Sequence, residues 1–211
     1  MSTSPQTPES NQQLTTENAS QRRESESTTS SSELTSVTLK LRKALRNFPD
    51  FPIPGIDFVD ILPLFASHDL HESLIRALEL QVLLVNGGKK PDVIVGLDAR
   101  GFLFGPSLAL RLGAGFAPVR KRGKLPGPTE EAIFDKEYGQ DYFQIQKDAI
   151  KPGQSVLVVD DIIATGGSAQ AAGKLVEKLG GNCMGYLFIL ELDFLKGRDK
   201  LNALVATLLR D

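Results

Sequence analysis

The chain has 211 residues, a formal net charge of −2 and 41% hydrophobic residues. That length is enough for one well-buried α/β domain with appendages, and the small net charge argues against a protein that binds nucleic acid through a general basic field. No apolar run is long enough to span a bilayer, and the first residues lack the pattern of a secretory signal. A single cysteine, Cys183, excludes a disulfide within the chain and a multi-cysteine metal site.

Residues 1–33 consist mainly of Ser, Thr, Gln, Asn and Glu. A segment with so few apolar residues cannot offset the entropy lost on ordering, so we predict a disordered tail. A transit peptide is the weaker alternative because Glu is frequent and the only arginines are Arg22 and Arg23. From residue 34 onward, apolar residues recur at helical spacing, which predicts a helix over residues 34–47. Three prolines in residues 48–55 then predict an irregular segment.

The rest of the chain alternates between helical and strand patterns. Helices are predicted over residues 68–85, 102–112 and 168–179, with a helical turn over 196–200. Strands are predicted over residues 93–97, 115–120, 155–161, 184–190 and 204–209, the last of them at an edge. Residues 121–142 show no apolar period and are predicted to form a long loop, which in a compact domain is usually functional. Alternating strands and helices predict a mostly parallel sheet with right-handed crossovers.

Charged residues follow three of the predicted strands, at the ends where ligands bind in such sheets. They are Asp98-Ala99-Arg100, Arg120-Lys121-Arg122 and Asp160-Asp161. The third group is the most informative, because a short turn, Thr165-Gly166-Gly167-Ser168, and then a helix follow it. Glycines let the backbone approach a ligand closely, and a helix N-terminus offers N–H groups and a positive dipole end to a phosphate. The paired carboxylates can accept hydrogen bonds from the hydroxyls of a ribose.

The alternative interpretation of this stretch is a capped helix with turn glycines and no ligand. The chain has neither the lysine of a Walker loop nor the glycine spacing of a dinucleotide fingerprint at this point. A ligand that carries both a phosphate and a sugar is therefore the hypothesis that the residues favour.

Residues 158–168 resemble the phosphoribosyl pyrophosphate motif of the type I phosphoribosyltransferases. Residues 48–52, 96–106 and 120–127 narrow the resemblance to the adenine phosphoribosyltransferases, and residues 191–198 are similar to their fungal form. The resemblance covers residues 34–209. It implies an α/β fold whose mostly parallel central sheet is flanked by helices, in a domain of residues 34–211 with a small N-terminal hood over 34–66 and a mobile lid loop over 121–142. It also implies a purine-salvage reaction that converts adenine and 5-phosphoribosyl 1-pyrophosphate to AMP and pyrophosphate.

By the same resemblance, Asp160 and Asp161 hold the ribose hydroxyls, and the turn binds the 5′-phosphate. The expected turn residues are Ala164, Thr165, Gly166, Gly167 and Ser168. Many family members carry Thr at the last of these positions, and Ser168 keeps the hydroxyl.

The resemblance places pyrophosphate against cationic residues. Arg100 matches the arginine of the family's pyrophosphate loop, and Arg120, Lys121 and Lys124 are further candidates, although exposed loops are often charged without any ligand. Ala99 stands where the family commonly has Ser, so a hydroxyl contact is lost while the backbone N–H remains.

On the adenine side, Glu137 matches the lid glutamate near N7 of the base and is expected to assist proton movement, with Tyr138 helping to close the lid. Phe58 matches the aromatic residue that stacks on adenine, and Ile56 and Val59 match positions whose backbone contacts the base edge. The alternatives are an exposed loop glutamate for Glu137 and plain core packing for Phe58. Many relatives have a charged residue where Val59 stands.

The family's reaction requires Mg²⁺, which is expected to be held mainly by substrate oxygens and water rather than directly by side chains. The resemblance further implies a homodimer, in the cytoplasm with the nucleus as a second location, and no nucleic-acid or membrane partner. Three alternatives stay open. They are the same chemistry on hypoxanthine or guanine, a non-catalytic nucleotide-sensing regulator, and a structural or interaction protein.

Overall fold

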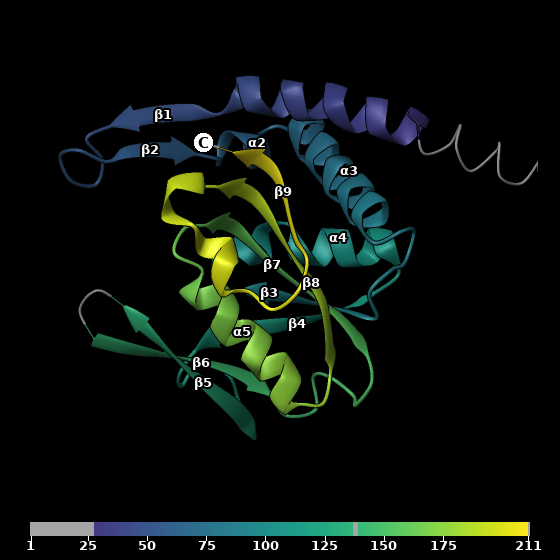
Figure 1. Cartoon of the computed structure of the whole chain (residues 1–211), viewed down its shortest axis with the longest axis vertical. Helices are drawn as coiled ribbons and strands as arrows, with labels where there is room; N and C mark the ends of the chain where they lie inside the picture. The colour runs from purple at the N-terminus through teal and green to yellow at the C-terminus, as the bar shows by residue number, and fades with distance from the viewer. Residues whose placement is uncertain (1–27, 137–138, 211) are drawn as a thin grey trace, which may run out of the picture.

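The computed structural model describes residues 28–136 and 139–210 (Figure 1). Its centre is a seven-stranded sheet with the strand order β5-β6-β4-β3-β7-β8-β9. Five neighbouring strands are parallel: β4 (Gly115–Lys121), β3 (Val93–Leu97), β7 (Ser155–Ile163), β8 (Asn182–Glu191) and β9 (Val205–Arg210). The structure thus confirms the expected mostly parallel sheet and the position of β9 at an edge.

Helices cover both faces of this sheet (Figure 1). The helix of residues 28–44, α3 (His68–Val85) and α4 (Gly105–Leu112) pack on one face, and α5 (Gly167–Lys178) packs on the other. Buried residues of the strands alternate between the two faces, because successive side chains of a strand point in opposite directions. Leu157 and Val159 belong to the first core, whereas Val156 and Val158 belong to the second. In the described ranges, no helix combines the length and apolarity needed to cross a bilayer.

Short elements complete the chain. They are β1 (Arg46–Pro49), β2 (Asp57–Asp60), α2 (Pro63–Ala66), and three 3₁₀ turns, η1 (Arg100–Leu103), η2 (Asp193–Leu195) and η3 (Gly197–Lys200). The helix predicted over residues 102–112 is interrupted, because η1 and α4 are separated by Phe104. The predicted helical turn at residues 196–200 corresponds to η3.

The first described helix begins earlier than the sequence predicts. Residues 28–33, assigned to the tail from their composition, are part of the helix that ends at residue 44. The reason is tertiary: Glu33 accepts two hydrogen bonds from the Arg76 guanidinium on α3, at 2.8 and 2.9 Å. Residues 1–27 of the expected tail lie outside the described part of the chain.

The irregular segment predicted around residues 48–55 is also partly wrong. Residues 46–49 form β1, which pairs antiparallel with β2 in a separate two-stranded ribbon. A proline is tolerated in such a ribbon because each of its two strands is an edge. Pro49 pairs with Asp57 at the end of the ladder.

The long loop predicted over residues 121–142 is largely a hairpin instead. Strands β5 (Thr129–Lys136) and β6 (Gly139–Gln146) pair antiparallel from Thr129↔Gln146 onward, and β6 joins the main sheet beside β4. The alternation is present in β5, where Ala132 and Phe134 are buried and Ile133 is exposed. Because Glu130, Glu131 and Asp135 flank these three residues, the average polarity of the segment is high and the short apolar pattern is difficult to detect in the sequence.

Candidate active site

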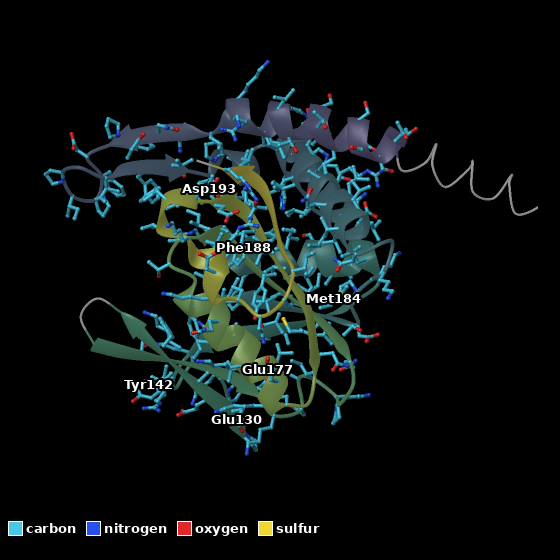
Figure 2. All side chains as sticks on the ribbon, viewed as in Figure 1. Glu130, Tyr142, Glu177, Met184, Phe188 and Asp193 are labelled. Carbon is cyan, nitrogen blue, oxygen red and sulfur yellow. The ribbon has the colours of Figure 1, made fainter. Side chains whose placement is uncertain are left out.

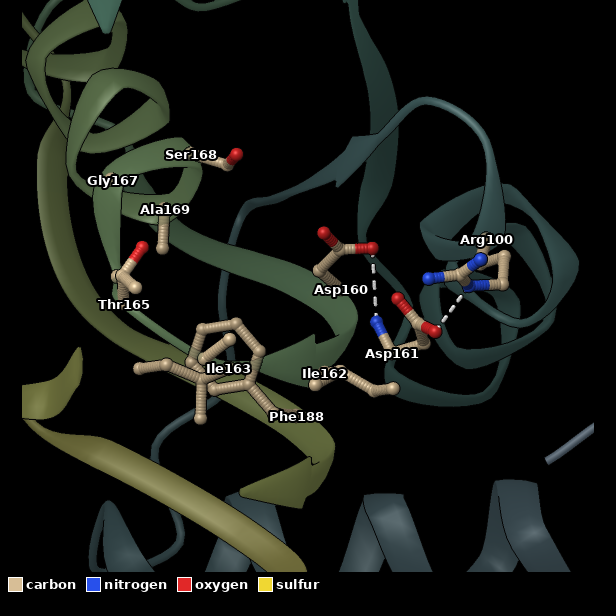
Figure 3. A pocket seen from close by; sticks show the side chains of 12 residues that line it. Arg100, Asp160, Asp161, Ile162, Ile163, Thr165, Gly167, Ser168, Ala169 and Phe188 are labelled. Carbon is tan, nitrogen blue, oxygen red and sulfur yellow. Dashed lines mark hydrogen bonds and ion pairs between the residues drawn. The ribbon is translucent and has the colours of Figure 1, made fainter. Parts of the chain in front are cut away.

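The carboxyl end of β7 and the turn into α5 form a cavity of about 260 Å³ (Figure 3). Its lining is Arg100, Asp160, Asp161, Ile162, Ile163, Ala164, Thr165, Gly166, Gly167, Ser168, Ala169 and Phe188. Every residue predicted to bind the ribose 5-phosphate is in this set, so the structure brings together what the sequence placed in one turn.

The turn is shaped to receive an anion. Gly166 has φ +78°, a left-handed conformation that disfavours other residues, and it is the N-cap of α5. No side chain caps this helix, so no side-chain oxygen satisfies its first N–H groups, and its first residues, Gly167 and Ser168, line the cavity. Thr165 is exposed and Ser168 is partly exposed. The cavity lining thus combines two hydroxyl-bearing residues with a helix N-terminus.

The two aspartates of β7 lie in different surroundings. Asp161 is buried, and its carboxylate accepts a hydrogen bond from Nε of Arg100. Asp160 accepts a hydrogen bond of 2.9 Å from the backbone N–H of Asp161 (Figure 3). Burial, followed by the nearby charge of Asp161, raises the pKa of Asp160 well above its usual value. Arg100 thus donates directly to Asp161 and acts on Asp160 only as a nearby charge.

Arg100 reaches the cavity from the neighbouring strand. It begins η1, which follows β3 after Asp98 and Ala99, and β3 pairs with β7, so the two strand ends adjoin. Its side chain is 49% exposed even though it contacts Asp161. A guanidinium in this position can meet an incoming anion and remain beside the carboxylate.

The other predicted cationic residues lie around this site rather than in the cavity lining. Nε of Arg120 is 2.8 Å from Oδ2 of Asp98, two residues before Arg100, and Arg120 also donates to the backbone oxygen of Lys124 at 3.2 Å. Lys121 forms an ion pair of 3.4 Å with Asp141 on β6. Ala99 is exposed between Asp98 and Arg100.

The residues expected to bind the base are on or beside the two-stranded ribbon, and none of them lines the cavity. Phe58 is partly exposed and packs edge-to-face on Phe51 with 5.3 Å between ring centroids. Ile56 is 45% exposed. The side chain of Val59 is in the core, so only its backbone could face a ligand.

Two predicted residues, Glu137 and Tyr138, lie outside the described residues, between the strands of the hairpin. The hairpin itself is held by side chains: Arg122 donates to Glu131 at 3.0 Å and stacks 3.5 Å from the ring centroid of Tyr142, which is labelled on the hairpin in Figure 2. Lys178 of α5 donates to the backbone oxygen of Glu131 at 2.5 Å.

The sequence reasoning missed the apolar part of the cavity. Phe188 is only 1% exposed and comes from β8, where it pairs with Asp160. Its position inside a continuous apolar run gives no local sign of a site. Ile162, Ile163 and Ala169 flank the predicted motif residues and could have been found as neighbours.

Comparisons with known proteins agree with this geometry. A family model described as a phosphoribosyl transferase domain matches residues 66–201. The adenine phosphoribosyltransferase of Yarrowia lipolytica is 61% identical over 176 residues, which are 83% of this chain and 97% of the relative. This chain belongs to the adenine phosphoribosyltransferase family. It is accordingly an enzyme, a transferase of phosphoribosyl groups, and the fungal resemblance of the sequence is confirmed.

Other members of the family give the same result. Adenine phosphoribosyltransferase 1 of Saccharomyces cerevisiae is 56% identical over 176 residues, which are 83% of this chain and 94% of the relative. A crystal structure of the Saccharomyces cerevisiae enzyme with an imino-altritol bisphosphate and adenine has a TM-score of 0.80 and 56% identity. It covers 82% of this chain and 99% of that chain.

Proposed function

We propose that this chain transfers the phosphoribosyl group of 5-phosphoribosyl 1-pyrophosphate to adenine, giving AMP and pyrophosphate, at the carboxyl end of β7. The observation that carries the proposal is the cavity in which two aspartates, an uncapped helix N-terminus and Arg100 meet. Its support from a relative is the Saccharomyces cerevisiae structure, which was solved with adenine and a sugar-like bisphosphate.

In this proposal the α5 turn holds the 5′-phosphate. The N–H groups of residues 165–168 and the hydroxyls of Thr165 and Ser168 donate to its oxygens. Asp160 and Asp161 accept hydrogen bonds from the ribose hydroxyls. Their negative charge then lies close to C1′, where positive charge develops as the bond to pyrophosphate breaks, by analogy with other glycosyl transfers.

The leaving pyrophosphate carries several negative charges, and the cationic residues around η1 are placed to neutralise them. Arg100 is the first candidate because it lines the cavity, and the N–H of Ala99 is beside it. Arg120, Lys121 and Lys124 belong to the adjacent end of β4 and the turn after it, and supply charge from the second side.

The donor's Mg²⁺ fits this set of residues. Within residues 28–136 and 139–210, no group of three or more His, Cys, Asp or Glu side chains could hold a metal ion. Mg²⁺ commonly keeps several waters and binds through one or two carboxylates together with substrate phosphates. Asp160 and Asp161 could provide such carboxylate or water-mediated contacts, and the ion would supply further neutralisation of the pyrophosphate oxygens.

For the base, we propose stacking on Phe58, backbone contacts from Ile56 and Val59, and proton transfer assisted by Glu137 with Tyr138 beside it. The hairpin that carries Glu137 would act as the lid that excludes water from the activated sugar. We further propose a cytoplasmic homodimer that acts in purine salvage, with residues 34–66 as a hood over the base.

The test is an assay of the purified full chain with adenine, phosphoribosyl pyrophosphate and Mg²⁺, in which AMP and pyrophosphate are measured. Parallel reactions with hypoxanthine and guanine determine the base. We expect product from adenine alone, and product only from another base would overturn the choice of adenine.

Replacement of Glu137 by Gln should lower turnover by about 10²–10⁴-fold, the usual contribution of general acid–base catalysis. Unchanged turnover would exclude Glu137 from the chemistry.

A further inference from the structure

The segment that follows β8, residues 192–200, packs against the backbone of the turn that is proposed to bind phosphate. Gly197, the first residue of η3, is buried against the turn backbone. A Cβ on Gly197 would overlap the backbone oxygen of Ala164 and lie 2.8 Å from the nitrogen of Gly166. A Cβ on Gly166 would in turn overlap the backbone oxygen of Gly197. The two glycines therefore let two backbone segments touch where no side chain fits.

An ion pair between a buried glutamate and a partly exposed arginine lies next to this contact. Glu191, the last residue of β8, has a side chain that is 3% exposed, and it accepts hydrogen bonds from Nε of Arg198 at 2.6 Å and from a second guanidinium nitrogen. Thr207 donates to the same carboxylate at 3.2 Å, and Arg210 lies 3.6 Å from it. Arg198 follows Gly197 directly, so the two-pronged contact holds Gly197 in register with the end of β8.

Two further contacts tie the same segment to the elements that carry the turn. The N–H of Leu192 donates to the backbone oxygen of Ile163 at the end of β7, at 3.0 Å. The side-chain amide of Gln170, in the first part of α5, donates to the backbone oxygen of Lys200 at 3.0 Å. The segment of residues 192–200 is thus joined to both ends of the turn, and neither Glu191 nor Arg198 lines the cavity.

We propose that Glu191 and Arg198 are positioning residues for phosphoribosyl transfer. Through Gly197 their ion pair sets the backbone of residues 164–166, and hence the direction of the N–H groups that receive the 5′-phosphate. This inference rests on the proposed function, because it assigns a support to the same site. A shift of the turn weakens binding of the phosphorylated sugar. It leaves binding of adenine unchanged, because the proposed base site lies on the two-stranded ribbon β1–β2.

The variants Arg198→Met and Gly197→Ala test the proposal. We expect each to raise the KM for phosphoribosyl pyrophosphate, and the dissociation constant for ribose 5-phosphate measured by calorimetry, by about ten- to a hundredfold. The KM for adenine should stay within about twofold, because the proposed base site lies on the ribbon β1–β2. A general loss of folded protein would instead lower turnover and leave both KM values unchanged. Arg198→Lys, which keeps the charge without the planar fork, should give an intermediate increase.

Lys200→Ala is the matched control, since it changes an exposed side chain of the same short helix and should leave both constants unchanged. Unchanged binding of ribose 5-phosphate in Arg198→Met and Gly197→Ala, or an equal rise in the KM for adenine, would overturn the proposal. If Arg198→Met does not fold, Arg198→Lys decides by the same two constants. Wild-type protein that binds no ribose 5-phosphate would instead overturn the proposed function and this inference together.

Discussion

The two neighbouring aspartates of β7 lie in different electrostatic surroundings. Asp161 is buried beside Arg100, whereas Asp160 lies next to a second carboxylate and is partly shielded from water. A carboxylate whose pKa is raised in the folded state favours folding only when it is protonated. Its contribution is complete below the unfolded pKa and is lost as the pH rises through the folded pKa. At neutral pH, the ionised form of Asp160 therefore lowers the free energy of unfolding of the protein.

Substituting Asp160 by Asn should make the protein more stable and less active. The substitution removes a charge that burial and Asp161 disfavour in the folded protein, so we expect the Tm to rise at neutral and alkaline pH. The gain should shrink as the pH is lowered, because Asp160 itself then becomes neutral. Thermal unfolding across pH and an AMP assay measure the two effects, and a gain independent of pH would contradict the explanation.

Glu191 should show the opposite pH dependence. The hydrogen bonds from Arg198 hold the pKa of Glu191 below its usual value. Stability from such a group is present above its unfolded pKa of about 4.3 and is lost as the pH falls through the folded pKa. The wild-type free energy of unfolding should therefore fall more steeply below about pH 4.5 than that of Glu191→Gln. Near neutral pH, denaturant titrations should show Glu191→Gln less stable by about 1–3 kcal/mol, and parallel pH curves would argue against the bridge.

At the scale of the elements, the packing of α5 on β8 allows little change. Gly173 of α5 lies so close to Tyr186 of β8 that a Cβ would overlap the tyrosine hydroxyl. That hydroxyl also donates to Oδ1 of Asn202 at 2.9 Å, and Tyr186 is 1% exposed. A glycine in the middle of a helix normally costs stability relative to alanine, so the helix gives up propensity for this contact.

Gly173→Ala should consequently lower the free energy of unfolding by about 1–3 kcal/mol, the usual cost of overpacking, despite the better helix propensity of alanine. Tyr186→Phe removes the overlapping oxygen, and the double variant should recover at least part of the loss. A double-mutant cycle with denaturant unfolding gives the coupling. Additive effects of the two substitutions would show that the hydroxyl is not what excludes the methyl group.

The elements also show where sequence reasoning succeeds. Helix α3 and strand β3 have the predicted bounds, because the Ser67 side chain caps α3 and continuous apolar residues mark β3. The hairpin β5–β6 was missed because its buried apolar residues form short groups that are flanked by charged residues such as Glu130, Glu131 and Asp135. In the site, the turn after Asp161 is contiguous in the chain and could be predicted, whereas Phe188 and Gly197 come from β8 and η3. Nothing in their own neighbourhood shows that folding brings them to the turn.

At the scale of the whole molecule, the helix of residues 28–44 joins the beginning of the described chain to its end. Leu41 is fully buried in the same core as Leu208 and Leu209 of β9. Arg42 beside it donates to the backbone oxygen of Arg210 at 2.9 Å. This helix leads directly into the ribbon proposed to cover the base, so its attachment determines where that ribbon lies (Figure 1).

Leu41→Ala should lower the free energy of unfolding by about 2–5 kcal/mol, because it leaves a cavity at a site with no exposure. Leu39→Ala provides the control on the same helix, since Leu39 is 56% exposed and its loss should cost less than about 1 kcal/mol. Chemical denaturation of both variants gives the comparison. Equal losses would mean that the helix is attached mainly by its polar contacts, such as that between Glu33 and Arg76.

The bond between Arg42 and the Arg210 carbonyl has a consequence for synthesis of the protein. Arg210 lies 168 residues after Arg42 in the chain, so the ribosome makes the partner of Arg42 long after this helix. The helix that is translated first can therefore complete its docking only after β9 has left the exit tunnel. Until then Leu41 lacks the β9 part of its apolar surroundings, so a nascent chain stalled before β9 should expose this helix to chaperones and proteases.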